Sequence, residues 1–499
     1  MSDDQQPLPP GWVHTALEDV LEVCDNLREP VNAEERALRT GPYPYYGANG
    51  QAGTIDDYRY DGDYVLLAED GGYFDAPARG VAYRAEGKFW VNNHAHVLKP
   101  LGEISTAFAV NALNAMDWMH YVSGTTRLKL NQSKMRSASM LVPPLPEQRR
   151  IVSKIEALQE RSGRAAKALA EVGPLLEQFR QSILAAAFSG RLTADWREKT
   201  PNVEPAHELL TRIRTERRHR WEQAELAKYQ AKGKQPPKDW KDKYEEPQRV
   251  SELEPPFNLP KEWVWATLDE LTHSMRSGNS KTSLKTATQW PILRSSAIRN
   301  GEIDYSDVNY MPEDEPPESE NVLTEGDLLV TRLSGSLEYV GMCAIVHDLG
   351  GQRIQYPDRL FRLRLSLGIN DRFVALAFRN KSLRTDLENS AKSSAGHQRI
   401  SLSDLRSFLV PLPPLEEQRT ICDLVASAIS MAELAGRVAD ESKSSLTQLN
   451  QSILAKAFRG ELVPQDPGDE PASELLARIR NSRDTTTTKS EGGSPRTKG

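Results

Sequence analysis

One helical pattern of twelve residues occurs twice in this 499-residue sequence, and the repeat limits the possible folds more than any other feature. Residues 181–192 read QSILAAAFSGRL and residues 451–462 read QSILAKAFRGEL, so nine of the twelve positions match. The two segments are separated by more than half the length of the chain. A separation this long excludes a solenoid repeat. Three further pairs of segments match in the same order: 8–17 with 259–268, 143–150 with 413–420, and 204–214 with 470–480.

Between the repeated segments lie two inserts, roughly residues 12–142 and 263–412, that show almost no similarity to each other. Each has the length of a domain. Stretches such as TIDDYRYDGDYVLLAEDGG and GDLLVTRLSGS alternate apolar and polar residues and end in Gly or Asp, which is typical of short strands. The sequence therefore predicts two different mixed α/β domains on one duplicated framework.

Each insert is followed by a segment that predicts a single long helix. Apolar or small residues alternate at steps of four and three from Ile151 to Ile183 and again from Ile421 to Ile453, with Phe179 and Leu449 at matching positions. This spacing is a heptad seam, which indicates that the two helices pair, most economically in antiparallel fashion. Packing of each seam on its neighbouring domain is the alternative. Gly173-Pro174 predicts a kink or a short break in the first helix.

Composition excludes several classes of protein. The formal net charge of −7 argues against a generally basic, sequence-blind nucleic-acid binder, although a local basic groove remains compatible with it. The three scattered cysteines form neither a disulfide framework nor a metal cluster. Since no apolar run is long enough to span a bilayer and the acidic N-terminus shows no secretory signal, we expect a cytoplasmic protein that does not enter a membrane.

The proline-rich edges and the helix ends together resemble a known family. VPPLPEQRRIV (142–152) and VPLPPLEEQRTI (410–421) each open a predicted helix that the twelve-residue pattern closes. This framework resembles the specificity subunit of type I restriction-modification systems. The resemblance implies an α+β fold in which two mixed α/β target-recognition domains are separated by a long antiparallel two-helix coiled coil with pseudo-twofold symmetry.

The resemblance divides the chain into six parts. They are target-recognition domain 1 (1–142), conserved spacer helix 1 (143–192), a charged extension and linker (193–258), target-recognition domain 2 (259–412), conserved spacer helix 2 (413–462), and a repeat remnant with a disordered tail (463–499). The extension is mildly basic and could contact phosphates or a partner subunit, although a solvated helix with a linker is the interpretation we favour. The tail TTTTKSEGGSPRTKG is predicted to be disordered.

Polar and aromatic residues in the predicted loops of the inserts suit contacts with base edges. Ordinary loop composition explains any single one of these loops equally well. The candidate DNA-binding residues are Tyr45, Tyr46, Asn49, Gln51, Asn92, Asn93, His94, Arg294, Arg332, Ser334, Ser336, Lys392, His397, Gln398 and Arg399.

The repeated segments are, by the same resemblance, where two modification (methyltransferase) subunits dock and where restriction subunits join the complex. Candidate partner-binding residues are Glu147, Gln148, Arg149, Gln181, Phe188, Glu417, Gln418, Arg419, Gln451 and Phe458. The partners expected are double-stranded DNA and these subunits. S-adenosylmethionine would then sit on the modification subunit, and ATP and Mg on the restriction subunit, with no cofactor on this chain.

No stretch of the sequence carries a complete catalytic motif, so we expect a non-catalytic subunit and no metal site. His94 and His96 would face the same way on a strand, but no nearby residues complete a metal-binding set. The alternative function is a scaffold whose two heads bind proteins and not DNA, which the negative charge favours. A methyltransferase gene beside this one would favour the DNA-binding interpretation.

Overall fold

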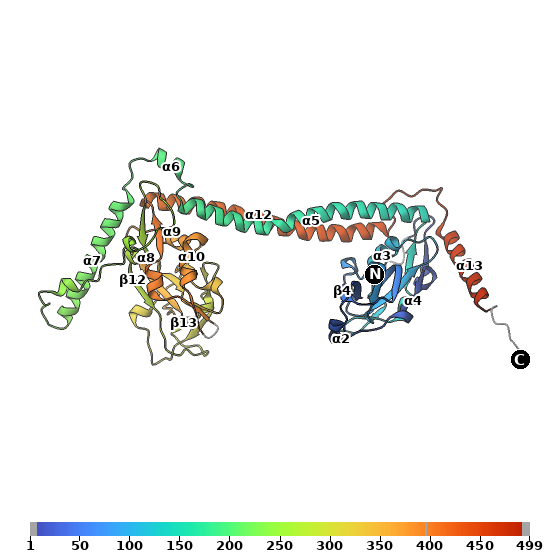
Figure 1. The fold of residues 1–499 in the computed structure, drawn as a ribbon, viewed down its shortest axis with the longest axis horizontal. Helices are drawn as coiled ribbons and strands as arrows, with labels where there is room; N and C mark the ends of the chain where they lie inside the picture. Colours follow the sequence, from blue (N-terminus) through green and yellow to red (C-terminus); the bar gives the residue numbers. More distant parts are fainter. Residues whose placement is uncertain (1–6, 395–396, 492–499) are drawn as a thin grey trace. The chain divides into compact units, whose positions relative to one another are not determined.

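The computed structural model describes residues 7–394 and 397–491 and divides into two compact units. Unit 1 comprises Met1–Glu171 with Val438–Gly499, and unit 2 comprises Val172–Arg437. Each unit contains a mixed α/β body and parts of two long helices, α5 (Leu145–Phe188) and α12 (Leu415–Ala457) (Figure 1). The expected fold class, two mixed α/β domains with paired long helices, is confirmed.

The body of unit 1 is built on a six-stranded sheet in the order β2-β7-β5-β6-β3-β4. All neighbouring strands are antiparallel except β3 and β6. The elements of this body are β1 (Val13–Ala16), α1 (Leu17–Val20), β2 (Leu21–Val23), α2 (Ala33–Leu38), β3 (Tyr43–Gly47), β4 (Gly50–Ile55), β5 (Tyr60–Ala68), β6 (Ala82–Val91), β7 (Ala95–Pro100), α3 (Thr106–Ala115), β8 (Val122–Ser123), β9 (Lys129–Leu130), α4 (Gln132–Arg136) and β10 (Ser139–Val142).

The second half of β5 is buried on both faces of the sheet, which explains why this strand ends in a continuous apolar run. Val65 and Leu67 face the main core together with Phe108 of α3, whereas Leu66 faces a smaller core with Phe89. Alternate residues of a strand point to opposite faces. The period of two therefore builds two hydrophobic layers from one strand.

The body of unit 2 uses smaller sheets, of which a four-stranded sheet (β12-β20-β17-β19) and a three-stranded sheet (β18-β22-β21) are the largest. Its elements are α6 (Ala194–Lys199), α7 (Ala206–Ala231), β11 (Val264–Thr267), α8 (Leu268–Leu271), β12 (Thr272–Ser277), β13 (Pro291–Leu293), β14 (Ile298–Arg299), β15 (Glu302–Ile303), β16 (Val308–Tyr310), β17 (Leu328–Thr331), β18 (Leu333–Ser334), β19 (Cys343–Ile345), β20 (Leu360–Leu365), α9 (Asp371–Ala377), α10 (Lys381–Ser390), β21 (Lys392–Ser394), β22 (His397–Arg399), α11 (Leu402–Arg406) and β23 (Leu409–Leu412).

In unit 1 the start of α5 packs on the end of α12. Ile151 and Ile155 are fully buried in the same core as Ile453. Further along α5, the Ser162 hydroxyl lies 3.0 Å from the Asn450 side-chain oxygen. Since rising numbers on α5 meet falling numbers on α12, the two segments are antiparallel, as the heptad seam predicts.

In unit 2 the same pairing involves the other halves of the two helices. Leu184 of α5 shares a core with Ile421 and Val425 of α12. Gly436 lies so close to Leu176 that an added Cβ would contact its side chain at 3.4 Å. Gly436, which lies next to the second seam, therefore allows close approach of the two backbones at this point.

Two details of the predicted seam are wrong. Phe179 and Leu449, which occupy equivalent positions, are 40% and 50% exposed. The heptad spacing is an average, and an α-helix drifts around the seam over several turns. Of the kink or short break predicted at Pro174, the break is absent, because α5 is helical without interruption from Leu145 to Phe188, and the kink stays a prediction.

A buried joint between a tryptophan and a glutamate, which we call the Trp–Glu joint, closes the framework of unit 1. The indole Nε1 of Trp12 donates to Glu147 Oε2 at 2.9 Å, and Gln465 Nε2 donates to the other carboxylate oxygen at 2.6 Å. Gln465 also reaches the carbonyl of Gly460. Burial raises the pKa of Glu147 above its ordinary value, against the effect of these two hydrogen bonds.

Unit 2 closes with an equivalent Trp–Glu joint that uses stronger donors. Trp263 Nε1 donates to Glu417 Oε2 at 2.8 Å, and Thr193 Oγ1 donates to Oε1 at 2.6 Å. Arg197 pairs with the same Oε1 and also donates to the carbonyl of Gly190. Gln465 in unit 1 and Arg197 in unit 2 thus have the same role. Each connects the buried glutamate of its joint to the glycine that follows a long helix.

Each unit combines repeated segments from distant parts of the chain. In unit 1 the N–H of Ala472 donates to the carbonyl of Gly11, and in unit 2 the N–H of Ala206 donates to the carbonyl of Glu262. The segment that follows each long helix therefore closes onto the start of the other insert. This exchange gives the two units the same internal framework.

The extension contains a helix, as we favoured from the sequence, and part of the tail that we expected to be disordered is also helical. Within 193–258, α7 buries Leu209, Leu210 and Ile213 in the core of unit 2. Helix α13 (Ala472–Glu491) includes residues 485–491 of the predicted disordered tail, because a helix that is already nucleated gains one hydrogen bond per added residue. Residues 492–499 of that tail lie outside the described residues. None of the helices in the described part of the chain is both long and apolar enough to cross a membrane.

Candidate nucleic-acid interface

The candidate residues on the β3–β4 hairpin of unit 1 point in different directions. Tyr45 is 1% exposed, and its hydroxyl donates to the carbonyl of Val31 at 3.0 Å. It belongs to the core, which argues against direct contact of this side chain with DNA. Tyr46 is half-buried beside Tyr83, and Gln51 is exposed.

The hairpin tip and the turn before β7 meet in one polar cluster. Asn49 Nδ2 donates to the carbonyl of Gly71 at 3.1 Å, and the N–H of Asn92 donates to the carbonyl of Tyr46 at 3.0 Å. Burial raises the pKa of Tyr83, so its hydroxyl keeps its proton and donates to the carbonyl of Gly47. The hairpin is therefore held against β6 while its polar side chains stay accessible.

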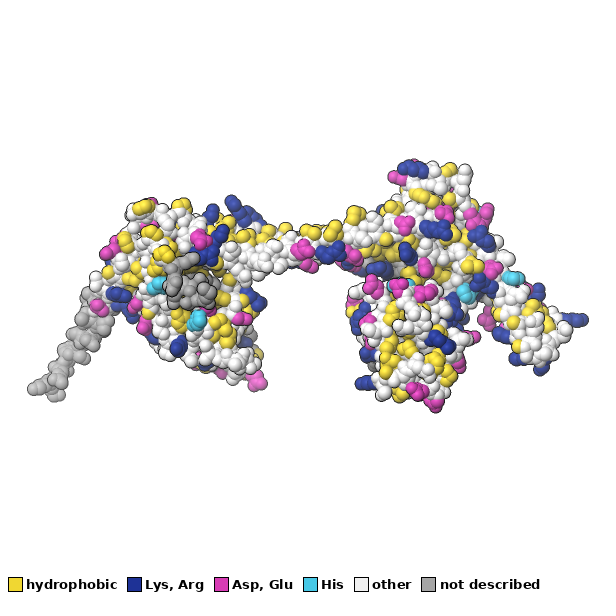
Figure 2. Space-filling view, turned by 180° about the vertical axis from the view of Figure 1, so that it is seen from behind, with side chains coloured by type: hydrophobic (Ala, Val, Ile, Leu, Met, Phe, Trp, Pro, Cys, Tyr) yellow, Lys and Arg dark blue, Asp and Glu magenta, His cyan; other side chains and the backbone are white. Residues whose placement is uncertain are grey.

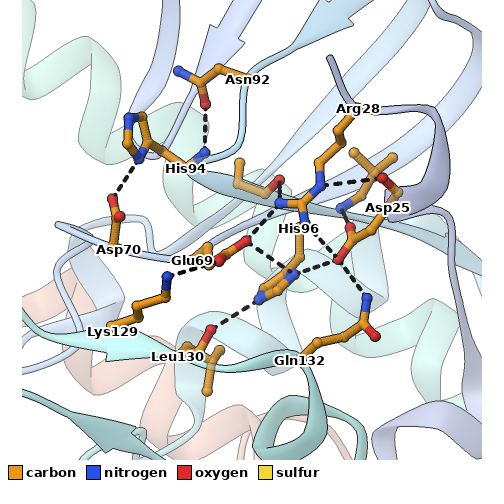
Figure 3. Close-up of polar contacts among 12 residues, drawn as sticks. Asp25, Arg28, Glu69, Asp70, Asn92, His94, His96, Lys129, Leu130 and Gln132 are labelled. Carbon is orange, nitrogen blue, oxygen red and sulfur yellow. Dashed lines mark hydrogen bonds and ion pairs between the residues drawn. The ribbon is translucent and has the colours of Figure 1, made fainter. Parts of the chain in front are cut away.

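His94 and His96 do not share a face, contrary to the sequence prediction. His94 lies in the turn before β7, where its Nδ1 is 2.8 Å from Asp70 Oδ1 and its side chain is 39% exposed (Figure 3). His96 lies within β7 and is 1% exposed. Its Nδ1 is 2.7 Å from Asp25 Oδ2, and its Nε2 is 3.0 Å from the carbonyl of Leu130. The first histidine thus remains a candidate for DNA contact, and the second is structural.

The buried charges around His96 fix the loops that carry the exposed residues. Burial alone would raise the pKa of Asp25, but hydrogen bonds from His96, from the N–H of Val97 and from Gln132 lower it overall. Arg28 bridges Asp25 and Glu69. This network, drawn in Figure 3, links the start of unit 1 to β7 and α4.

Two residues of this cluster were missed from the sequence. Asp70 accepts a hydrogen bond from Arg127 at 2.7 Å, and the same carboxylate oxygen lies 2.8 Å from His94 Nδ1. Arg127 is 61% exposed. Gly71 after Asp70 and Gly124 near Arg127 indicate tight loops at both places. No sequence pattern, however, predicts that Asp70 and Arg127 contact each other. Asn93, beside His94, is exposed.

In unit 2 the three-stranded sheet brings most of the candidates together. Ser334 pairs with Gln398, and Lys392 pairs with Arg399. Lys392 and Arg399 are exposed, whereas Gln398 is half-buried. His397 lies in β22, but its side chain falls outside the described residues. Two segments that are far apart in the chain therefore form one polar surface.

Next to this sheet lies a hollow of about 340 Å³ lined by hydroxyl and guanidinium groups. Ser334 and Ser336 contribute to it, and the Ser336 N–H donates to the Ser334 hydroxyl at 3.3 Å. Arg332 is half-buried and donates to the carbonyl of Asp358 at 3.1 Å. The lining also includes Ser295, Ser296, Arg299, Tyr339 and Arg359.

The arginines around this hollow differ in how far they are committed to internal contacts. Arg294 pairs with Asp307 at 2.9 Å, and Ser296 donates to the same carboxylate. The Arg299 guanidinium lies 5.7 Å from the centre of the Tyr339 ring. Arg299 was missed because a single Arg in a loop carries no distinguishing pattern in one sequence.

Most of the candidate partner-binding residues are covered by the chain itself. Glu147, Gln148, Glu417, Gln418, Phe188 and Phe458 are 0–9% exposed. Gln148 and Gln418 each donate to the carbonyl of the proline five residues earlier, at 2.9 and 3.0 Å. This burial argues against direct partner contact through these six side chains, because their repetition serves the framework.

The remaining candidates lie at the surface. Arg149 and Arg419 are 70% and 57% exposed, and Gln451 is exposed. Gln181 is half-buried and accepts from the N–H of Lys381 at 3.4 Å. Both arginines therefore point outward from the turn in which the buried Glu and Gln hold the framework.

The chain is similar to known proteins over most of its length. A family model described as type I restriction modification DNA specificity domain matches residues 9–171 and 260–435. The specificity subunit of the EcoKI type I restriction enzyme of Escherichia coli K12 is 28% identical over 399 residues, covering 78% of this chain and 74% of that protein. The EcoDI specificity subunit of Escherichia coli is 23% identical over 497 residues, covering 95% and 96%.

Solved structures share the fold at low sequence identity. The HsdS subunit from Thermoanaerobacter tengcongensis matches with a TM-score of 0.52 and 18% identity, covering 92% of this chain and all of that one. A chain of a type I restriction-modification system matches with a TM-score of 0.58 and 19% identity, covering 91% and 100%. The two stretches matched by the family model make up more than half of the sequence, and the chain belongs to the family of type I restriction-modification DNA specificity domains.

Proposed function

We propose that this chain is the non-catalytic DNA specificity subunit of a type I restriction-modification system, and that each unit reads one half of a bipartite site. The observation that carries the proposal is the contrast between like frameworks and unlike bodies. Both units close through the same Trp–Glu joint, yet one presents a six-stranded sheet and the other a set of smaller sheets. Two unlike reading surfaces recognise two unlike half-sites.

The reading surface proposed for unit 1 is the cluster of Asn49, Asn92, His94 and Arg127. Amide groups match the hydrogen-bonding edge of adenine, and a guanidinium matches that of guanine. For unit 2 the surface is the β18-β22-β21 sheet with the adjoining hollow. Both surfaces combine exposed polar groups with a backbone that hydrogen bonds hold in place, which suits direct readout of bases.

An exchange of inserts tests this assignment. Replacing residues 263–412 by the insert of a related chain should change one half of the methylated sequence and leave the other half unchanged. Sequencing of methylated adenines in the host genome reads out both halves together. A change in both halves, or in neither, would refute separate recognition by the two units.

Point variants in unit 2 refine the test. Gln398→Ala with Arg399→Ala should relax specificity at one or two base pairs, each worth about 1–3 kcal/mol of discrimination. Lys381→Ala, at an exposed position of α10, serves as the control and should leave the methylated sequence unchanged.

We further propose that the outer face of the helix pair docks the modification subunits. Within unit 2, Met431, Leu434 and Leu424 of α12 are 62%, 54% and 42% exposed, and Leu175 and Phe179 of α5 are 58% and 40% exposed. Large apolar side chains at helical spacing on a solvent-facing side mark a surface that a partner covers. An amphipathic helix of the modification subunit is the occupant we propose.

Substitution of the outer face tests the docking. Met431→Ser with Leu434→Ser should weaken assembly with the modification subunit at least tenfold and leave the melting temperature of the isolated chain unchanged. Glu433→Ala, on the same helix turn, provides the control. Equal assembly by both variants would exclude this face as the docking site.

In the assembled system proposed here, S-adenosylmethionine binds the modification subunit, and ATP with Mg binds the restriction subunit. This chain supplies sequence recognition and attachment points. Binding of a duplex that carries the methylated sequence, measured on the complex, separates this function from that of a protein-binding scaffold, which would show no preference for that duplex.

A further inference from the structure

The extension between the repeats forms a hairpin whose two arms are fixed to helix α8. On the outgoing arm, Arg214 of α7 pairs with the buried Glu270, with its Nε 3.0 Å from Oε1, and Arg217 lies 3.3 Å from Asp269. On the returning arm, the N–H of Gln248 donates to the same Asp269 at 3.1 Å. The backbone carbonyl of Gln248 accepts a hydrogen bond from the Thr267 hydroxyl at 2.6 Å. Adjacent acidic residues of one short helix thus anchor both arms.

Further out, an aromatic cluster joins the two arms. Trp221 of α7 stacks on Trp240 of the returning arm, with ring centres 5.9 Å apart, and lies 5.3 Å from the Tyr244 ring. The Lys241 ammonium is 3.1 Å from Glu222. These contacts make the hairpin a defined projection, in which the predicted helix and the linker after it are held against each other.

The hairpin ends in a basic tip, which we define as residues 228–243. The tip contains six lysines and two aspartates, although the whole chain has a net charge of −7. Lys232, Lys234, Lys238 and Lys243 are exposed, and no described carboxylate forms an ion pair with any of them. Figure 2 shows Lys and Arg side chains, in dark blue, over the end of this projection.

The composition of the extension distinguishes between two classes of partner. A stable protein interface requires apolar anchors at its centre. Between residues 193 and 258, no described Leu, Ile, Val, Met, Phe or Trp side chain is exposed. Phosphate contacts need only cations that can replace condensed counterions. Lysines that form no ion pair with a described carboxylate meet that need, whereas the aromatic side chains of the tip, Tyr229 and Trp240, are half-buried.

We propose that the basic tip binds the sugar-phosphate backbone of the DNA duplex, independently of base sequence. The proposal rests on the proposed function of the chain in DNA recognition, and adds a non-specific contact to it. Since lysine is a compact, strongly hydrated cation, the contact strengthens binding without reading bases. The tip then contributes to affinity and to its salt dependence, and the methylated sequence remains set by the two reading surfaces.

Two variants of the same four positions provide the test. One replaces Lys232, Lys234, Lys238 and Lys243 by Gln, and the other replaces them by Arg, which keeps the charge. Each is assembled with the modification subunits, and its dissociation constant is measured against salt with two duplexes, one carrying the methylated sequence and one of random sequence. Assembly without DNA is measured in parallel by size-exclusion chromatography.

The Gln variant should bind both duplexes more weakly by the same factor. The slope of log K against log salt should fall by about 0.9 for each lost phosphate contact, or up to about 3.6 for four. The Arg variant should behave like the unchanged chain. An unchanged slope in the Gln variant overturns the proposal, as does weaker assembly without DNA, which would identify a protein partner. If the unchanged complex fails to prefer the methylated sequence, the proposed function itself fails; an unchanged slope rejects the tip contact alone.

Discussion

The two Trp–Glu joints predict opposite responses to the same substitution. Glu417→Gln removes the charge that Arg197 pairs with, and arginine has no acceptor to offer the new amide group. Glu147→Gln faces a different neighbour, because the amide of Gln465 can reverse and accept where it now donates. The glutamine variant of unit 2 is therefore expected to be far less stable than that of unit 1.

The expected magnitudes follow from burial and partners. Glu417 is fully buried and Arg197 is 21% exposed, so loss of the pair should cost about 3 kcal/mol, the low end for a broken buried ion pair. Glu147 has only neutral donors at hydrogen-bond distance, and one weak contact of Gln465 with Gly460 is lost on reversal. The cost of Glu147→Gln should stay within about 1 kcal/mol.

Differential scanning calorimetry of the full chain can measure both effects. For a unit of the size of Val172–Arg437, about 3 kcal/mol corresponds to a fall of about 6 °C or more in melting temperature. Glu147→Gln should shift the melting temperature by no more than about 2 °C. Equal destabilisation by the two variants would refute the argument, since it would mean that the identity of the donors does not matter.

The pH dependence of unit 1 provides a second check on the same pair. Burial raises the pKa of Glu147, so the folded state holds the proton more tightly than the unfolded state. Unit 1 should therefore lose stability as pH rises from the ordinary glutamate pKa through the raised value. Glu147→Gln cannot titrate and should lack this loss; a variant that retains it would assign the effect to another group.

Two further predictions concern single positions. Gly190 has φ +74°, and an added Cβ would lie 2.4 Å from Pro260 Cγ, so Gly190→Ala should lower the melting temperature by several degrees. As the control, Gly163→Ala in the open middle of α5 should raise the melting temperature, because it should add up to about 1 kcal/mol to the free energy of unfolding. An unchanged melting temperature in Gly190→Ala would contradict the backbone strain and the clash with Pro260. Asp25 has a lowered pKa, so the stability it contributes should be lost as pH falls below about 3.8. Asp25→Asn should remove that acid-induced loss in denaturant titrations, whereas a variant with the acid response of the unchanged chain would show that the His96 contact has no such role.

The long helices and their pairing could be predicted because they repeat. A seam that recurs in the second half of the chain specifies both the helices and their partners, and the ends at Gly190 and Gly460 follow from the glycines, which have φ +74° and +76° in the structure. The burial of Glu147 and Glu417 could not be predicted. Charged residues are almost always exposed, and nothing local shows that a tryptophan from a distant part of the chain will donate to them.

The sequence predicted which kinds of residues form the candidate interface, but it did not predict which of their side chains face solvent. Tyr45 and Tyr46 are neighbours in one strand, so one of them had to face the core, but the sequence does not say which. The pairing of Ser334 with Gln398 depends on a sheet register between strands that are far apart in the chain. Contacts of this kind follow from tertiary packing. The two inserts do not repeat each other, so no second copy in the sequence indicates which of their strands pair.

The exchange of framework segments has a consequence for synthesis of the chain. Unit 2 is one continuous stretch, whereas unit 1 needs Gln465 and Ala472, which leave the ribosome after all of unit 2. The unit that begins first is thus completed last, the reverse of the usual order in which N-terminal domains finish folding before later ones. A premature stop near residue 460 would therefore spare unit 2 and leave unit 1 without the segments that complete it.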